Sequence, residues 1–347
     1  LSANSPCINS GISEGLMNEG QPVVLPSTDM NYTARIKDCT IDIGAYERDN
    51  EDNTQPDENG VYYVTWTGFG NASANSPENA ACADKLQTVL NAAGTRANSK
   101  QTAIVKIAGY ENGEFVYHAN TLSDENNPQS YTFVVPDGVT VMGGYFEGTF
   151  TNGQYNKDGW DDVRTGDNVR NAIKFRTMLS ATAVPTQGST ITQEVTGYHA
   201  VTFGEGDGTK ALTKGATIDG VWLIDGSATS MAGAGNPATR GGGAIVPSGA
   251  HVRNCVVQGN TAIEGGGLYL LPGATVSGTA ILDNSADNGG GVYADNTGIT
   301  ENTRSHIISC TIADNTADDG GGLFLEDGAS MQVNTVIWGN EAPSNKN

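Results

Sequence analysis

The chain has 347 residues, a formal net charge of −21 at pH 7 and 46 glycines. The acidic balance argues against a nucleic-acid-binding protein, because a polyanion is bound through a basic surface. No run of about 18 apolar residues occurs, so no transmembrane helix is predicted. Abundant glycine with few helix-forming residues favours many short strands and turns.

The chain opens with a leading segment, residues 1–48, followed by a polar stretch. Residues 49–60 carry five acidic side chains and Pro56, a composition that predicts a solvated linker. Five cysteines are widely spaced and fit neither a dense disulfide framework nor a metal site. Buried thiols are the main expectation, with a local disulfide between Cys7 and Cys39 as the alternative. The cysteines are Cys7, Cys39, Cys82, Cys255 and Cys310.

One short helix and six strand regions are predicted next. The helix spans residues 84–93, with Asp84 as its cap and Gly94 at its end. Leu86, Val89, Leu90 and Ala93 share one face, so this helix can cover the open end of a stack of strands. The strand regions are 104–108, 131–135, 139–145, 173–179, 200–203 and 216–224.

A repeat begins near residue 241. Each unit has three glycines, a short apolar strand, a turn, and a second strand that ends in asparagine. Two spacings are 24 residues and the third is 31, with the extra residues placed between Asp295 and Arg304. The glycine triplets start at Gly241, Gly265, Gly289 and Gly320, and the asparagines are Asn260, Asn284, Asn315 and Asn340.

This period predicts an all-β solenoid, a right-handed parallel β-helix over residues 61–347 with a short N-terminal capping helix. Stacked coils about 4.8 Å apart bury an apolar row that one coil cannot bury alone. The asparagines then form a ladder of amide hydrogen bonds, and the glycines permit sharp corners and close approach. Two further rows should point into the core: Cys255, Thr279, Cys310 and Thr335, and Val257, Ile281, Ile312 and Ile337.

Several stretches resemble a known repeat family. Gly265–Tyr269, Ile281–Ala286 and Thr311–Ala317 are similar to the polymorphic outer-membrane-protein type of β-helix repeat. The resemblance implies a pectate-lyase-like fold in large bacterial surface or secreted proteins, some of them adhesive. It therefore predicts an extracellular or outer-surface location.

The leading segment resembles the far end of the same family. Ser5–Gly11 and Ile41–Glu47 look like the closing segment of such a β-helix, although here they come first. One explanation is a window from a longer protein with tandem β-helices. The other is head-to-tail self-association, in which residues 1–48 of one molecule complete the open end of another.

Acidic residues recur near the glycines and the asparagines. Stacked carboxylates repel unless a cation bridges them, and oxygen-rich clusters suit calcium. Calcium is therefore a candidate ligand, and the alternative is a solvated acidic edge. The candidate residues are Asp283, Asp287, Asp314, Asp318 and Asp319.

No catalytic site is recognisable, so no catalytic residue is assigned. The Gly-His-Gly and Asn-Thr-Asp motifs of polygalacturonase-type hydrolases are absent, and Arg35–Lys37 precedes both Asp-Asp pairs, in the wrong order. We therefore expect a non-catalytic module that binds a glycan or a surface protein or presents a rigid surface. The alternative is a calcium-assisted polysaccharide lyase or glycoside hydrolase.

Binding is expected along a strand face or in the irregular loops 109–130, 146–170 and 226–240. One stretch, rich in glycine and asparagine, holds several aromatic residues. They predict either a platform on which a sugar can stack or a loop packed on the flank of the solenoid. The residues are Tyr145, Phe146, Phe150, Tyr155 and Trp160.

Overall fold

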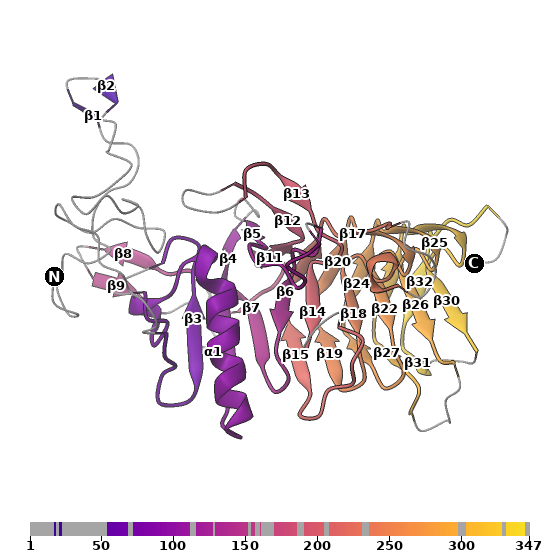
Figure 1. Cartoon of the computed structure of the whole chain (residues 1–347), viewed down its shortest axis with the longest axis horizontal. Coiled ribbons are helices and arrows are strands. Elements are labelled where there is room, and N and C mark those ends of the chain that lie inside the picture. Colours follow the sequence, from indigo (N-terminus) through magenta and orange to yellow (C-terminus); the bar gives the residue numbers. More distant parts are fainter. Residues whose placement is uncertain are drawn as a thin grey trace.

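The computed structural model shows an elongated stack of short parallel strands, with one helix beside its N-terminal end (Figure 1). It describes residues 54–68, 72–111, 116–127, 129–151, 154–156, 160, 170–185, 191–204, 208–230, 236–297, 303–327 and 331–343, and the strands β1 (Met17–Asn18) and β2 (Gln21–Pro22). The rest of the leading segment, with Cys7 and Cys39, lies outside the described residues, as do residues 49–53 of the linker.

Four sheets run along the stack, and from β15 onward the chain visits them in order within each coil. The first contains β3 (Val61–Val64), β4 (Ile104–Glu111), β7 (Thr140–Phe146), β10 (Phe175–Arg176), β15 (Ala216–Asp219), β19 (Ala250–Arg253), β23 (Thr275–Ser277), β27 (His306–Ile308) and β31 (Met331–Val333). The second contains β5 (Val116–His118), β11 (Met178–Ser180), β16 (Trp222–Ile224), β20 (Val256–Gln258), β24 (Ala280–Leu282), β28 (Thr311–Ala313) and β32 (Val336–Trp338).

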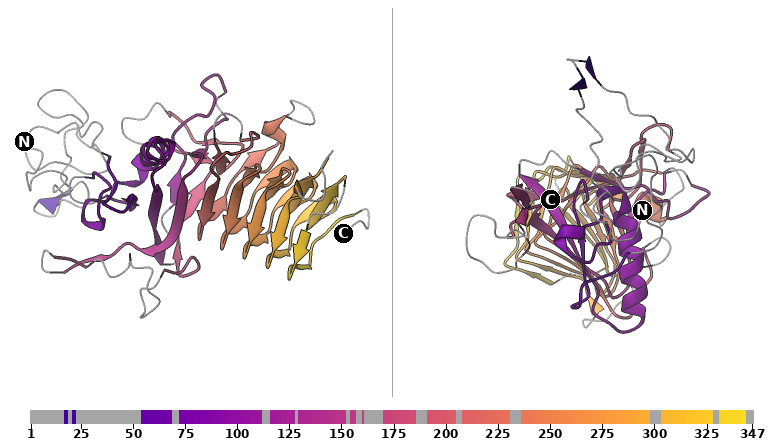
Figure 2. Two further views of the ribbon diagram at one scale, coloured as in Figure 1. Left: turned by 90° about the horizontal axis from the view of Figure 1, so that it is seen from below. Right: turned by 90° about the vertical axis from the view of Figure 1, so that its left-hand side faces the viewer.

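The third sheet contains β17 (Ser227–Ala228), β21 (Thr261–Glu264), β25 (Ser285–Asn288) and β29 (Thr316–Asp319). The fourth contains β6 (Phe133–Val135), β14 (Val201–Phe203), β18 (Ala244–Val246), β22 (Leu268–Leu270), β26 (Val292–Asp295) and β30 (Leu323–Glu326). Two antiparallel hairpins leave the stack: β8 (Thr149–Thr151) with β9 (Gln154–Asn156), and β12 (Thr182–Ala183) with β13 (Val195–Thr196). The mostly β structure with stacked parallel sheets agrees with an all-β parallel solenoid (Figure 2).

The predicted inward rows form the core in the interior coils. Val257, Ile281 and Ile312 are fully buried, and Cys255, Thr279 and Cys310 are 2% exposed or less. Strand pairing follows the repeat: Leu268 pairs with Val292 across 24 residues, whereas Thr275 pairs with His306 across 31. The seven-residue insertion therefore lies between β26 and β27, as the spacing predicted.

The asparagine ladder is present. Each side-chain amide donates to the Oδ1 atom of the asparagine in the next coil, at 3.0 Å from Asn260 to Asn284 and 2.9 Å from Asn284 to Asn315. Each Nδ2 also donates to a backbone carbonyl of the preceding coil, such as Val257 O for Asn284. These buried amides thus satisfy both their donors and their acceptors inside the protein, which stabilises a buried polar row.

The three glycines of each triplet have different roles. The first adopts a positive φ, 69° at Gly265 and 66° at Gly289, a backbone conformation that residues with a side chain rarely adopt. The second and third lie against the neighbouring coil: a Cβ atom on Gly266 would lie 2.3 Å from Ser285 O, and one on Gly267 would lie 2.6 Å from Gly291 O. The predicted corner and close approach are both confirmed.

Two predicted strands are divided in the structure. Region 216–224 splits into β15 and β16 because Gly220 turns the chain with a φ of 71°. Region 173–179 likewise splits, and its parts β10 and β11 belong to different sheets. The apolar run was continuous in sequence because both strands that flank a corner supply inward side chains.

The helix boundaries were predicted incorrectly. Helix α1 spans Leu86–Asn98 after a 3₁₀ turn, Ala83–Lys85, and Asp84 makes no cap hydrogen bond. Gly94 lies inside the helix because it packs on Pro136, where a Cβ atom would approach Pro136 Cβ to 2.7 Å. The predicted buried face is confirmed, with Leu86, Val89 and Leu90 at most 2% exposed. Within the described residues, no helix is long and apolar enough to span a membrane.

The cysteines divide into two groups. Cys255 and Cys310 are buried free thiols, and burial raises the pKa of Cys255 to about 12, so it stays protonated and unreactive. Cys82 is buried and disulfide-bonded, so the expectation of a free thiol was wrong at this position. The cysteine bonded to Cys82 lies outside the described residues.

Candidate functional site

Two of the predicted calcium ligands occupy a left-handed corner of the coil. Asp283 and Asp314 have φ values of 54° and 56°, and Gly259 and Gly339 stand at the equivalent position of other coils with φ near 70°. Aspartate, like glycine and asparagine, tolerates this conformation. Asp283 also accepts a hydrogen bond from Gln258 Nε2 at 2.7 Å. The recurrence of aspartate here therefore has a backbone explanation that needs no metal.

The other predicted calcium ligands lie on the third sheet. Asn288 pairs with Asp319, so Asp287 and Asp318 lie beside each other, both exposed on the same outer edge. Within the described part of the chain, no three His, Cys, Asp or Glu side chains gather as a metal site would require. The pair offers fewer ligands than the six to eight oxygens that calcium takes. Calcium binding therefore stays a prediction.

Three residues of the predicted aromatic platform, Tyr145, Phe146 and Trp160, have described side chains, and all three pack against other rings. Tyr145 is fully buried and Trp160 is 4% exposed, and their rings stack with centroids 5.5 Å apart. The ammonium of Lys106 lies 4.9 Å from the Tyr145 ring centroid and donates to Trp160 O. Phe146 packs against Phe175. These contacts favour the flank-packing interpretation, because a sugar needs an uncovered ring face.

Phe150 and Tyr155 face each other across the β8–β9 hairpin as backbone partners, and their side chains lie outside the described part.

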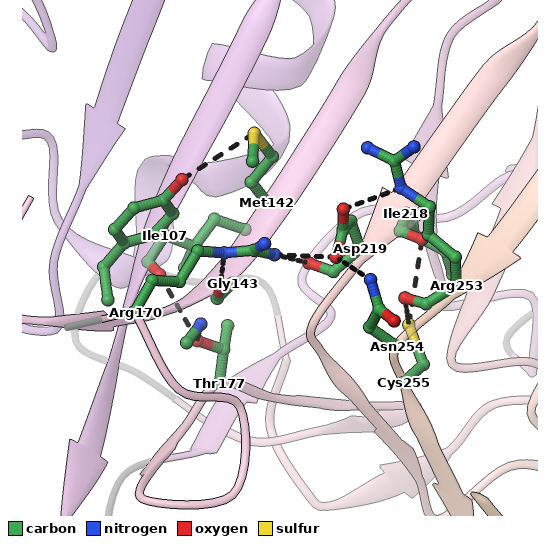
Figure 3. Close-up of polar contacts among 12 residues, drawn as sticks. Ile107, Met142, Gly143, Arg170, Thr177, Ile218, Asp219, Arg253, Asn254 and Cys255 are labelled. Carbon is green, nitrogen blue, oxygen red and sulfur yellow. Dashed lines mark hydrogen bonds and ion pairs between the residues drawn. The ribbon is translucent and has the colours of Figure 1, made fainter. Parts of the chain in front are cut away.

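A buried ion-pair cluster was missed by the sequence analysis (Figure 3). Asp219, at the end of β15, is 3% exposed and accepts hydrogen bonds from Arg170 at 2.9 Å, Arg253 at 2.7 Å and Asn254 at 3.1 Å. Burial by itself would raise the pKa of Asp219, but the three donors outweigh it and hold that pKa below its usual value. Arg170 also donates to Gly143 O, so the cluster ties neighbouring coils together.

A column of stacked aromatic rings covers the outer face of the fourth sheet. The Tyr269 and Tyr293 rings are stacked 5.0 Å apart, and Phe324 continues the stack at 4.9 Å. Arg240 lies over the Tyr269 ring and pairs with Glu264 at 2.9 Å. Tyr269 and Tyr293 donate to Asp295 and Glu326 respectively.

The Tyr269 and Tyr293 phenols stay protonated at neutral pH. Burial raises both of their pKa values, and their carboxylate acceptors raise them further. Both rings are buried, and each hydroxyl is already bonded to a carboxylate. The column therefore stiffens this face of the stack and leaves few groups for chemistry.

At the N-terminal end of the same face, two of the predicted binding loops meet. Loop 109–130 and loop 226–240 enclose a cleft of about 250 Å³ over the fourth sheet. Its lining combines aromatic rings with hydroxyl, amide and carboxylate groups. The lining residues are Ser123, Asp124, Asn127, Ser130, Tyr131, Tyr198, His199, Thr202, Asn236, Pro237 and Ala238.

Local turns hold these loops in place. Asn236 Oδ1 accepts from the Ala238 amide and so starts the short helix η4 (Pro237–Thr239). In the other loop, Ser130 Oγ donates to Asp124 O and Asn127 O. The Tyr198 hydroxyl donates to Gln129 Oε1 at 3.3 Å, and Asn127 Nδ2 donates to the same hydroxyl at 3.4 Å. These hydrogen bonds preorganise the walls of the cleft, so the walls are formed before a ligand binds.

No family model matches the chain, and the comparisons with curated proteins and with solved structures found no significant similarity.

Proposed function

We propose that the chain is a right-handed parallel β-helix that acts as a non-catalytic extracellular module for binding and presentation. The asparagine ladder and the aromatic column support a rigid rod, because both run unbroken through several coils. A rigid scaffold with irregular loops at one place holds a binding site at little entropic cost. The ligand is expected to be a glycan or a surface protein.

The convergence of loops 109–130 and 226–240 on one cleft carries this proposal. Their approach is not a consequence of the repeat, since neither loop belongs to it. The cleft combines two tyrosines and uncharged polar groups with one carboxylate, Asp124, and with His199, whose Nδ1 is bonded to Gly241 O. This lining suits binding better than acid–base catalysis. The enzymatic alternative needs convergent carboxylates and a base. In the described part, the acidic and basic side chains around Arg240 and Glu264 and around Asp219 are already paired with one another.

A polysaccharide screen tests the proposal. The protein is incubated with neutral and acidic polysaccharides, with calcium or with EDTA, and both binding and new chain ends are followed. Binding without cleavage supports the module. Cleavage that requires calcium would replace the proposal with the lyase or hydrolase and direct attention to Asp287 and Asp318.

A second candidate function is head-to-tail self-association through residues 1–48. The coil that contains β31 and β32 is paired on one side only within the described chain, and its apolar residues are exposed: 46% at Ile337 and 72% at Trp338, against none at Ile312. The leading segment contains Cys39-Thr40-Ile41, which repeats the coil sequence Cys310-Thr311-Ile312. Such a segment from a second copy can add a strand to β32.

Sedimentation of the whole chain over a range of concentrations tests the self-association. Concentration-dependent growth that Trp338→Lys abolishes supports it. Ile173→Lys is the control, because Ile173 is 62% exposed at a distant site. A single-chain mass at every concentration excludes the association.

A further inference from the structure

We propose that the cleft between residues 123–131 and 236–238 is a binding site for one hexopyranose ring that carries no acid group. The inference rests on the proposed binding function and names the ligand class of its site. The cleft lies in two of the predicted binding loops, but it contains none of the aromatic residues predicted from sequence as a platform for a sugar.

The size of the cleft limits the ligand to a small group. Its volume of about 250 Å³ lies below the roughly 300–1,000 Å³ of sites that hold drug-sized molecules. A single sugar ring at the end of a glycan fits such a space, whereas a peptide segment or an extended chain needs a longer groove.

The lining matches the two-sided character of a sugar. A hexopyranose ring has apolar C–H faces and hydroxyl groups around its edge, so it pairs with an aromatic ring and with polar groups beside it. Tyr131, half-buried, and Tyr198, 9% exposed, supply rings at the wall. Asp124, Asn127 and Asn236 supply carboxylate and amide groups at the rim.

A buried hydroxyl in the lining supports a hydrogen-bonding ligand. Thr202 is 1% exposed, and its Oγ1 atom has no hydrogen-bond partner among the described residues. A buried hydroxyl without a hydrogen-bond partner destabilises the protein. Because Val201 and Phe203 point into the core, Thr202 projects from the outer face, where its side chain lines the cleft.

The charge of the cleft decides between classes of sugar. Among its described lining residues, Asp124 is the one carboxylate and none is a lysine or an arginine. A carboxylate accepts hydrogen bonds from two sugar hydroxyls and attracts an amino group, but it repels a uronate or a sialic acid. The net charge of −21 acts in the same direction. The expected ligand is therefore a neutral or an amino sugar.

The orientation of His199 is consistent with a prearranged wall. Its Nδ1 atom lies 2.8 Å from Gly241 O, so the nitrogen donates to this carbonyl, and the ring is 6% exposed beside Tyr198. The hydrogen bond joins the cleft wall to the first glycine of a triplet. The ligand site is thus attached to the rigid part of the stack rather than to a loop alone.

Saturation-transfer NMR and calorimetry with the whole chain test the inference. The probes are the methyl glycosides of glucose, galactose, N-acetylglucosamine, glucosamine and glucuronic acid. We expect at least one neutral or amino sugar to bind and glucuronide to bind more weakly. If none of these sugars binds, or if glucuronide binds most tightly, the inference is wrong.

Three variants locate the bound sugar. Thr202→Val should weaken binding about two- to tenfold while the melting temperature stays equal or rises, because an unpaired hydroxyl is removed. Tyr131→Ala should weaken binding by about three- to tenfold through lost stacking. Asp124→Asn should weaken glucosamine more than glucose. Thr275→Val, on an outer position of β23, is the matched control and should leave binding unchanged.

The outcomes separate this inference from the proposed function. Polysaccharide binding that all three cleft variants leave intact retains a binding module but refutes the sugar cleft. A Thr202→Val variant that loses stability together with binding assigns the hydroxyl a structural role and also refutes the inference. Monosaccharide binding in the cleft without any polysaccharide binding supports the site while the proposed surface function fails.

Discussion

The side chain of Gln87 replaces a missing strand at the edge of the fourth sheet. Its Nε2 atom donates to Val134 O at 3.0 Å, and its Oε1 atom accepts from Val134 N–H at 2.9 Å. Val134 lies in β6, where that sheet ends. The helix side chain thus satisfies the N–H and C=O groups of Val134, which would be unpaired on an edge strand. It also keeps another strand from pairing at this residue.

Replacing Gln87 with alanine should therefore destabilise the protein by about 1–3 kcal/mol, because two backbone groups lose their partners. Urea unfolding measures the change, and hydrogen exchange at Val134 should accelerate. Gln101→Ala, at an exposed position, is the control and should change stability by less than about 0.5 kcal/mol. Equal stability of the two variants would show that water replaces the Gln87 amide.

Asn284→Ala should cost at least about 3 kcal/mol, since the neighbouring coils each lose hydrogen bonds inside a buried ladder. The side chain of Asn284 donates to Val257 O and Asn315 Oδ1, and it accepts from the backbone and side-chain amides of Asn260. Thermal unfolding checks the prediction against Asn59→Ala, a substitution at an exposed asparagine. A small effect would mean that the ladder adds specificity but little stability.

Asp219 should make stability depend on acid pH. Its pKa is lowered in the folded protein, so its stabilisation is fully present above the unfolded value of about 3.9 and is lost as the pH falls through the lower folded pKa. The difference in unfolding free energy between the wild type and Asp219→Asn should thus be large at pH 6 and shrink below about pH 4. Asp287→Asn, on the exposed edge, is the comparison. A difference that stays constant with pH contradicts the ion-pair assignment.

Asp283→Gly should keep or raise the melting temperature, whereas Asp283→Val should lower stability by about 1–2 kcal/mol. The reason is the φ of 54° at this corner, which glycine adopts freely and a β-branched residue does not. Measuring both variants with calcium and with EDTA separates backbone conformation from metal binding. A calcium-dependent rise in melting temperature that Asp283→Gly removes would restore the metal interpretation.

The repeating part of the molecule could be predicted from the sequence alone. Spacings of 24 and 31 residues set which residues stack, so Leu268 over Val292 and Asn284 over Asn315 could be predicted without coordinates. Prediction succeeds there because each coil pairs with the next, and the same residue types recur at the same corner. Corners without a repeat were missed, as at Gly220, because a continuous apolar run does not show where a strand bends.

The contacts between irregular segments follow from tertiary packing and could not be predicted from the sequence. Asp219 binds Arg170 and Arg253 across 49 and 34 residues, separations that no period in the sequence indicates. Tyr145 and Trp160 belonged to a stretch with the composition of a surface platform, yet their rings stack on each other and are buried. The cleft joins Tyr131 and Tyr198 to the turn at Pro237. Such contacts depend on how loops of different length pack on the stack, and local sequence patterns do not predict that packing.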